Sequence, residues 1–193
     1  KMIEIYDEVE FDEVTFENEN IEEVQADYVI FRDTTLKNVN FIDVTLNKVE
    51  FIHTHFINCD LSNINLENAA IHYCTFTNCK LVGTHITEAS IREVIFKTCQ
   101  CDYATLGGSK MKDISFDGCR MEQTGLNNCK LTKVTFKECQ MANAEFGDTK
   151  LSGIDLSSCC IEGIRVKLED LKGVKLTPMQ ALEFSKRLGI VIV

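Results

Sequence analysis

A strict period of five residues constrains this chain more than any other feature of its sequence. From Phe11 to Val166, every fifth residue is Phe, Leu, Ile, Met or Val, except Ala26 and Cys101, which are also apolar. Helices repeat every 3.6 residues and strands every two, so neither alone produces this pattern. An unbroken internal repeat is typical of a solenoid, in which each unit packs against its neighbours.

A second position in each unit is also restricted. The residue two before each large apolar residue is small or β-branched, as at Val9, Val29, Cys59 and Ala69, except at Glu19. The three other residues of each unit are mostly polar. Each unit therefore directs one large and one small side chain inward and three outward, which describes one side of a narrow tube.

A period of twenty is superimposed on the period of five. Three sets of like residues share it: Phe16, Phe56, Phe76, Phe96, Phe116 and Phe136; Cys59, Cys79, Cys99, Cys119, Cys139 and Cys159; and Asn18, Asn38, Asn58 and Asn78. If four units complete one coil, these sets stack as an aromatic column, a thiol column and an outer amide ladder.

The order small residue, Asp or Asn, then Leu or Phe resembles the pentapeptide-repeat family over about residues 9 to 168. The resemblance implies an all-β solenoid, a right-handed quadrilateral β-helix of about eight coils, with a C-terminal α-helix and a short tail. We place the β-helix at residues 1–176 and a capping or dimerisation helix with its tail at residues 177–193.

The ten cysteines indicate packing rather than chemistry. Most of them occupy the small inward position, where a reduced thiol serves as a small hydrophobic group. A straight column of thiols does not converge on a metal in the tetrahedral geometry that zinc requires. Reduced thiols in turn favour a cytoplasmic location.

No arrangement of residues in the sequence predicts catalysis. The four histidines fall on outward positions, which favours solvated surface residues. His53 and His72 could approach each other on adjacent coils, so a metal site there is the less favoured alternative. Motifs for phosphate binding or nucleophilic catalysis are absent from the sequence, and a filled tube leaves little room for a pocket. We therefore expect no enzyme, no cofactor and no metal. No long apolar run predicts a membrane-spanning helix, and the first residues have no signal-peptide hydrophobic region.

The excess negative charge lies at the N-terminal end of the chain. Residues 1–50 hold 14 Asp and Glu against 4 Lys and Arg, while residues 51–193 hold equal numbers of both. Seven of these acids fall on outward positions and form the predicted partner-binding surface: Glu10, Asp12, Glu13, Glu17, Glu22, Glu23 and Asp27. They are either a solvated end cap or a contact surface for a basic partner. Direct binding of nucleic acid is disfavoured, because it depends on neutralising phosphates.

The C-terminal residues depart from the repeat. Thr177, Pro178 and Gln180 predict the start of a helix, Gly189 its end, and residues 190–193 a short strand. The apolar surface of this segment either plugs the tube or forms a twofold homodimer contact. The predicted dimerisation residues are Met179, Leu182, Phe184, Leu188, Ile190 and Val191.

Within the family, the single uninterrupted helix and the terminal segment resemble loopless members of the quinolone-resistance (Qnr-type) and MfpA-like group. That resemblance implies a homodimer that mimics DNA, binds DNA gyrase or topoisomerase IV and protects the enzyme from quinolones. The alternative is a rigid scaffold for another protein. Lys110, Lys130 and Lys150 share the period of twenty and predict a basic column on the same rod.

Overall fold

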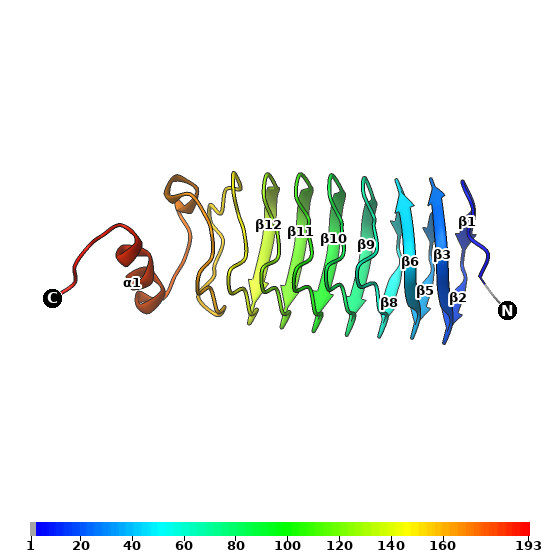
Figure 1. The fold of residues 1–193 in the computed structure, drawn as a ribbon, viewed down its shortest axis with the longest axis horizontal. Coiled ribbons are helices and arrows are strands. Elements are labelled where there is room, and N and C mark those ends of the chain that lie inside the picture. Colours follow the sequence, from blue (N-terminus) through cyan, green and yellow to red (C-terminus); the bar gives the residue numbers. More distant parts are fainter. Residues whose placement is uncertain (1–2) are drawn as a thin grey trace.

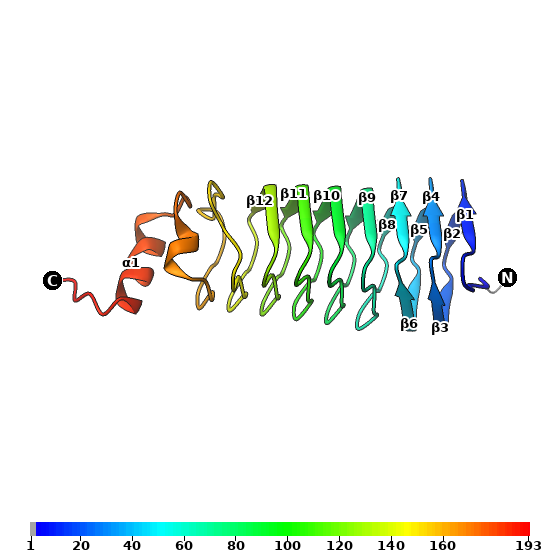
Figure 2. The ribbon, with the colours of Figure 1, turned by 90° about the horizontal axis from the view of Figure 1, so that it is seen from above.

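The computed structural model describes residues 3–193 as a straight rod with the two chain ends at opposite tips (Figures 1 and 2). Its paired strands are parallel and lie in register with a shift of twenty residues, as in Phe76↔Phe96 and Phe96↔Phe116. The strands are β1 (Glu10–Asp12), β2 (Thr15–Glu17), β3 (Asn20–Asp27), β4 (Ile30–Arg32), β5 (Thr35–Lys37), β6 (Asn40–Asn47), β7 (Glu50–Ile52), β8 (His55–Ile57), β9 (Ala70–Thr77), β10 (Ser90–Lys97), β11 (Lys110–Asp117) and β12 (Lys130–Lys137).

The strands form one large sheet and one small sheet around the tube. The large sheet runs in the order β1-β4-β7-β9-β10-β11-β12, with β2, β5 and β8 joined along its flank, and β3 pairs with β6 in the second sheet. Each coil of the chain adds one rung to every side. The fold is therefore the right-handed quadrilateral β-helix that the resemblance to the pentapeptide-repeat family implies.

The regular strand ladder is shorter than the sequence predicts. From β1 to β12 it makes about six turns rather than eight, and further pairing is carried by isolated bridges such as Gln140↔Cys160 and Glu145↔Arg165. The reason is local. The ladder ends after β12 because the next coil closes as a tight turn, in which Ile154 N–H donates to Leu151 O at 3.0 Å. Similar turns, such as Ala144 N–H to Met141 O at 3.1 Å, leave only isolated bridges on the other sides.

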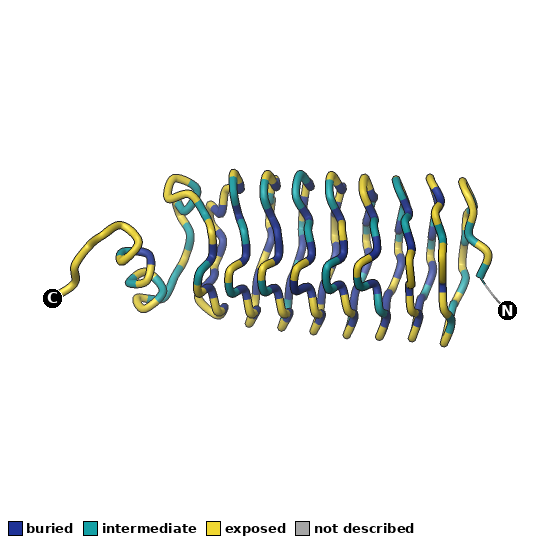
Figure 3. The backbone as a smooth tube through the Cα atoms, in the orientation of Figure 1, coloured by how far each residue is buried: buried dark blue, intermediate teal, exposed yellow. Residues whose placement is uncertain are grey.

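Buried positions recur along the whole length of the tube (Figure 3), and their side chains fill its inside in columns. The rings of Phe56, Phe76, Phe96, Phe116 and Phe136 stack with centroids 4.4 to 5.2 Å apart. Phe16 belongs to the same column, separated from Phe56 by Leu36. The predicted aromatic column is thus confirmed, and offset stacking of this kind stabilises beyond the burial of area alone.

The small inward positions form a second kind of column. The thiols of Cys59 and Cys99 donate to the carbonyl oxygens of Leu36 and Phe76, at 3.2 and 3.3 Å. The structure has no disulfide among the described cysteines, of which Cys160 alone is exposed. Outside the tube, the Asn38 side chain donates to Asn18 at 2.9 Å, which begins the predicted amide ladder.

The outward corners explain the abundance of Asn, Asp and Gly. One residue of almost every five has a positive φ, for example Asn18 at 57°, Asn58 at 53° and Asp113 at 55°. Asn, Asp and Gly adopt this left-handed conformation at the lowest cost. At Gly83, with φ of 66°, an added Cβ would also lie 2.3 Å from the Asn63 amide oxygen, so both conformation and space favour glycine.

The C-terminal end begins as predicted and finishes differently. After a 3₁₀ turn at Leu168–Leu171, helix α1 spans Pro178–Arg187, with Thr177 and Gln180 forming a reciprocal capping box. Gly189 ends the helix, because its N–H donates to Lys186 O at 3.0 Å in a left-handed conformation. Residues 190–193 are not a strand, contrary to the prediction, because no described strand lies beside them to pair with. Among residues 3–193, no helix is long and apolar enough to cross a membrane.

Candidate protein-interaction surfaces

The seven predicted acidic residues encircle the N-terminal tip of the rod. All seven are exposed, and they occupy all four sides of the first coils because successive units turn the chain around the axis. Glu13 and Glu23 sit at corners with φ of 52° and 53°. The structure therefore gathers these acids as a ring at one end rather than as a line along the rod.

Some of this charge is already neutralised within the chain. Glu10 pairs with Arg32 at 2.5 Å and Glu17 pairs with Lys37 at 2.7 Å, in each case from one coil to the next. Both pairs are well exposed, so each stabilises the fold only slightly. The remaining acids of the ring form no ion pair within the described chain, and they keep their charge free for a partner.

A second acidic feature runs along the whole rod and was not recognised in the sequence. Two adjacent sides of the tube are defined by the bridges from Asn40 to Cys160 and from Thr45 to Arg165. They carry ten acids at outward positions of the repeat, which we call the acidic side: Glu22, Glu23, Asp27, Asp43, Asp60, Glu67, Asp102, Glu122, Glu145 and Glu162. Of these, Asp102 is buried beside Arg120. Sorting every Asp and Glu by the twenty-residue period would have found it.

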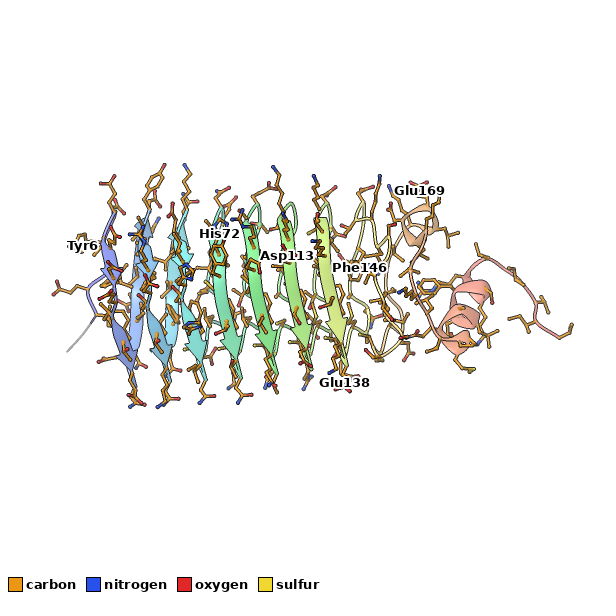
Figure 4. All side chains as sticks on the ribbon, turned by 180° about the vertical axis from the view of Figure 1, so that it is seen from behind. Tyr6, His72, Asp113, Glu138, Phe146 and Glu169 are labelled. Carbon is orange, nitrogen blue, oxygen red and sulfur yellow. The ribbon has the colours of Figure 1, made fainter. Side chains whose placement is uncertain are left out.

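Few cations interrupt the acidic side. It holds Lys80, Arg120, Arg165 and Lys167. Three of these are paired with carboxylates: Arg120 with Asp102 at 3.1 Å, Arg165 with Glu145 at 3.4 Å, and Lys167 with Asp148. Figure 4 shows side chains projecting beyond both long edges of the rod. Six of the ten acids lie at positions 22–67, where no cation of this side interrupts them, while positions 80–167 hold four acids and four cations. The acidic side is therefore negative over its N-terminal half and balanced over the rest.

The basic column predicted from the period of twenty is present on another side. Lys110 and Lys130 are direct register partners on β11 and β12. Both are exposed, as is Lys150, which follows twenty residues later. In the described chain none of the three has a carboxylate within 4.0 Å. Like charges stacked this way destabilise a sheet slightly, so packing within the rod does not account for them.

The predicted dimerisation residues divide into two groups. Met179, Leu188, Ile190 and Val191 are exposed, with Val191 at 84%. Phe184 is instead buried against the chain's own last coil and lies under the Arg187 guanidinium, 5.0 Å from the ring centroid, so it does not offer surface to a partner. Leu182 is half-buried. A groove of about 410 Å³ separates α1 from the last coil.

The histidines do not form a metal site in the described chain. The His53 ring stacks on Tyr73 with centroids 4.9 Å apart, and His72 Nε2 lies 2.9 Å from the Ser90 hydroxyl. Residues 3–193 contain no cluster of three metal-ligating side chains. Burial and the nearby Arg92 lower the pKa of His72, which favours its neutral form.

The repeat identifies the class of protein as a β-solenoid, and comparison identifies the family. A family model described as a pentapeptide repeat region matches residues 49–119 and 109–184, and one described as pentapeptide repeats in eight copies matches residues 29–63. The chain belongs to the pentapeptide-repeat family. No curated protein matches it.

Solved structures share the fold at low sequence identity. HetL, a pentapeptide-repeat protein involved in regulating heterocyst differentiation in the cyanobacterium Nostoc sp. strain PCC 7120, matches with a TM-score of 0.61 and 17% identity, over 88% of this chain and 87% of HetL. Full-length QnrB1, a plasmid-mediated fluoroquinolone resistance protein, matches with a TM-score of 0.48 and 17% identity, over 94% of this chain and 100% of QnrB1. At this identity the similarities concern the fold alone.

Proposed function

We propose that this protein is a non-catalytic rod whose acidic side occupies the DNA-binding surface of a partner, and that the partner is DNA gyrase or topoisomerase IV. The observation that carries the proposal is the line of carboxylates along two adjacent sides of the rod, continued by the acidic ring at the tip. A basic surface that binds DNA attracts a negative rod by the same electrostatic forces.

The charge density sets the expected strength of this mimicry. With about 4.8 Å between strands, the acidic side is about 34 Å long. Averaged over this length, its net charge is roughly one per 6 Å, against one per 1.7 Å along duplex DNA, and this net charge is concentrated at positions 22–67. We therefore expect the protein to compete with DNA at micromolar concentration and at low salt, and to lose to DNA as screening increases.

A supercoiling assay with purified gyrase, with and without a fluoroquinolone, tests the proposal. We expect the wild-type protein to inhibit supercoiling or to protect the enzyme from the drug. The variant Glu22→Lys/Glu67→Lys/Glu162→Lys should lose this effect, because it reverses three exposed carboxylates of the acidic side.

The matched control reverses three equally exposed carboxylates on the other sides of the rod, Asp33→Lys/Glu93→Lys/Glu138→Lys. It changes the net charge by the same amount and should retain the effect. If wild type neither inhibits nor protects gyrase and topoisomerase IV, the proposal is wrong. Equal loss in both variants would show that net charge, rather than the acidic side, is responsible.

A rigid scaffold for a different protein is the second candidate. The unpaired column of Lys110, Lys130 and Lys150 favours it, because a surface that only mimics DNA has no use for a basic column. Pull-down against a proteome by the wild type and the acidic-side variant distinguishes the two. Recovery of one non-topoisomerase partner by both proteins supports the scaffold.

A further inference from the structure

One column of outward side chains changes from acidic to basic along the rod. The register of β1, β4, β7, β9, β10, β11 and β12 stacks these residues in order. From the N-terminal end the column reads Glu10, Ile30, Glu50, Ala70, Ser90, Lys110 and Lys130, and Lys150 follows twenty residues later. The acids thus lie in the first half, the small residues at the centre and the lysines in the second half.

The charges of this column are complementary to those of a second copy that runs in the opposite direction. A twofold axis that lies across the column between Ala70 and Ser90 turns a second copy antiparallel to the first. The column of one copy then faces the same column of the other. The operation places Glu10 opposite Lys150, Glu50 opposite Lys110, Ile30 opposite Lys130 and Ala70 opposite Ser90. By symmetry each pairing occurs twice, so four Glu–Lys pairs face each other across one contact. Glu10 also pairs with Arg32 of its own chain, whereas Glu50 and Lys110 have no ion-pair partner within the described chain.

We propose that this side of the rod, which we call the polarised face, is a contact between two antiparallel copies of this chain. This self-contact is separate from the proposed binding of a topoisomerase, and it uses other residues than the C-terminal contact predicted from the sequence. Within the chain, Lys110, Lys130 and Lys150 have no carboxylate partner among the described residues, and the second copy supplies one for Lys110 and one for Lys150.

The neighbouring outward column of the same face permits the contact. It runs through Asp12, Arg32, Ile52, His72, Arg92, Lys112, Thr132 and Ser152. The same axis opposes Asp12 to Ser152, Arg32 to Thr132, Ile52 to Lys112 and His72 to Arg92. Since the pKa of His72 is lowered and the ring stays neutral, no two like charges meet in this column. The small Ala70 and Ser90 at the centre let the sheets approach to about 10 Å.

The size of the face makes the contact weak. Eight rungs at about 4.8 Å and a strand width of about 10 Å give roughly 350 Å² per copy. That is below the area of a standard stable interface, so the attraction of the charges is the main contribution. We expect a dissociation constant on the order of 10⁻⁴ M at low salt.

Two full-length variants with opposite charge test the proposal. Lys110→Glu/Lys130→Glu/Lys150→Glu makes the charged residues of the column all acidic, and Glu10→Lys/Glu50→Lys makes them all basic. Each variant should lose the contact with itself, whereas an equimolar mixture should restore it as a heterodimer. Sedimentation equilibrium at about 0.3 mM protein and about 10 mM salt, where the Debye length is about 30 Å, measures all samples.

The outcomes separate this contact from other kinds of association. A dimer through α1 and the tail would form equally in every sample, so the polarised face is measured by the association that the two single variants lose and that wild type and the mixture show. A control, Lys80→Glu/Arg120→Glu/Arg165→Glu, places three charge changes outside the polarised face and should associate as wild type does. No salt-sensitive association of wild type, or no recovery in the mixture, overturns the proposal.

Discussion

At the scale of single residues, cysteine and threonine have the same function in this tube. The Thr84 hydroxyl donates to Leu61 O at 2.6 Å, and the Cys99 thiol donates to Phe76 O at 3.3 Å, in each case 23 residues back along the chain. Both side chains are small, buried and hydrogen-bonded to the preceding coil. The thiol column is therefore explained by packing, and the described chain has no buried side-chain N or O atom without a partner.

Replacing Cys99 with Ala should lower the free energy of unfolding by about 1 kcal/mol, since one small buried group and a weak hydrogen bond are lost. Cys99→Thr should cost less, because Thr occupies equivalent positions at Thr54 and Thr84. Urea unfolding of both variants measures the difference. A loss of several kcal/mol for Cys99→Ala would show that the thiol takes part in a disulfide or a metal site.

Thiol reactivity should follow burial. Burial raises the pKa of Cys74 to about 12 and of Cys129 to about 11, from an ordinary value of 9.0. The folded protein keeps these protons while the unfolded chain releases them, so stability is full below pH 9 and falls as pH rises from 9 toward 12.

At neutral pH a thiol reagent should modify Cys160 alone in the native protein and all ten cysteines after denaturation. Rapid modification of a second native thiol would contradict this.

At the scale of elements, Gln180 joins α1 to the solenoid. Its Oε1 accepts from Thr177 N–H at 2.8 Å, while its Nε2 donates to the carbonyls of Leu156 and Cys159, both at 2.9 Å. These carbonyls belong to the last full coil, next to the point where Lys175 forms the final bridge with Asp155. The capping residue of the helix thus also caps the β-helix.

The variant Gln180→Ala should loosen α1 from the rod, because three hydrogen bonds worth about 1 kcal/mol each are lost. Amide hydrogen exchange in α1 should rise by up to about a hundredfold, since about 1.4 kcal/mol corresponds to a factor of ten, while exchange in β9 to β11 stays unchanged. Glu183→Ala is the control, since Glu183 makes only an exposed pair with Lys186. Equal protection of α1 in wild type and Gln180→Ala would refute the assigned role.

The domain division at residue 177 and the homodimer through the terminal segment stay predictions that one experiment tests. We expect full-length protein to be a dimer through Met179, Leu188, Ile190 and Val191, which a single chain leaves exposed. Deleting residues 177–193 should yield a monomer, or an aggregate through the uncovered tube end. Light scattering measures the molar mass of both proteins at tens of micromolar and so distinguishes a dimer from a monomer. A full-length monomer that the deletion leaves unchanged would exclude the contact.

At the scale of the whole molecule, the repeat determines what the sequence predicts well and what it predicts poorly. Residues that obey the period, such as Phe96 and Cys99, were placed correctly because each coil copies the register of the last. Phe184 and residues 190–193 were misplaced because no period fixes how a terminal helix packs. The acidic side was missed because its acids, such as Asp43 and Glu162, belong to different columns and lie on one side only after the chain is coiled.

The central claim is that the acidic side competes with DNA for a basic surface, and displacement of labelled duplex DNA from gyrase tests it most directly. Wild-type protein at micromolar concentration and low salt should displace the DNA. Displacement should weaken steeply toward about 0.15 M salt, where exposed charges are screened within about 8 Å. Glu22→Lys/Glu67→Lys/Glu162→Lys should displace the DNA at least tenfold less well. No displacement, or equal displacement by wild type and this variant, would contradict the account.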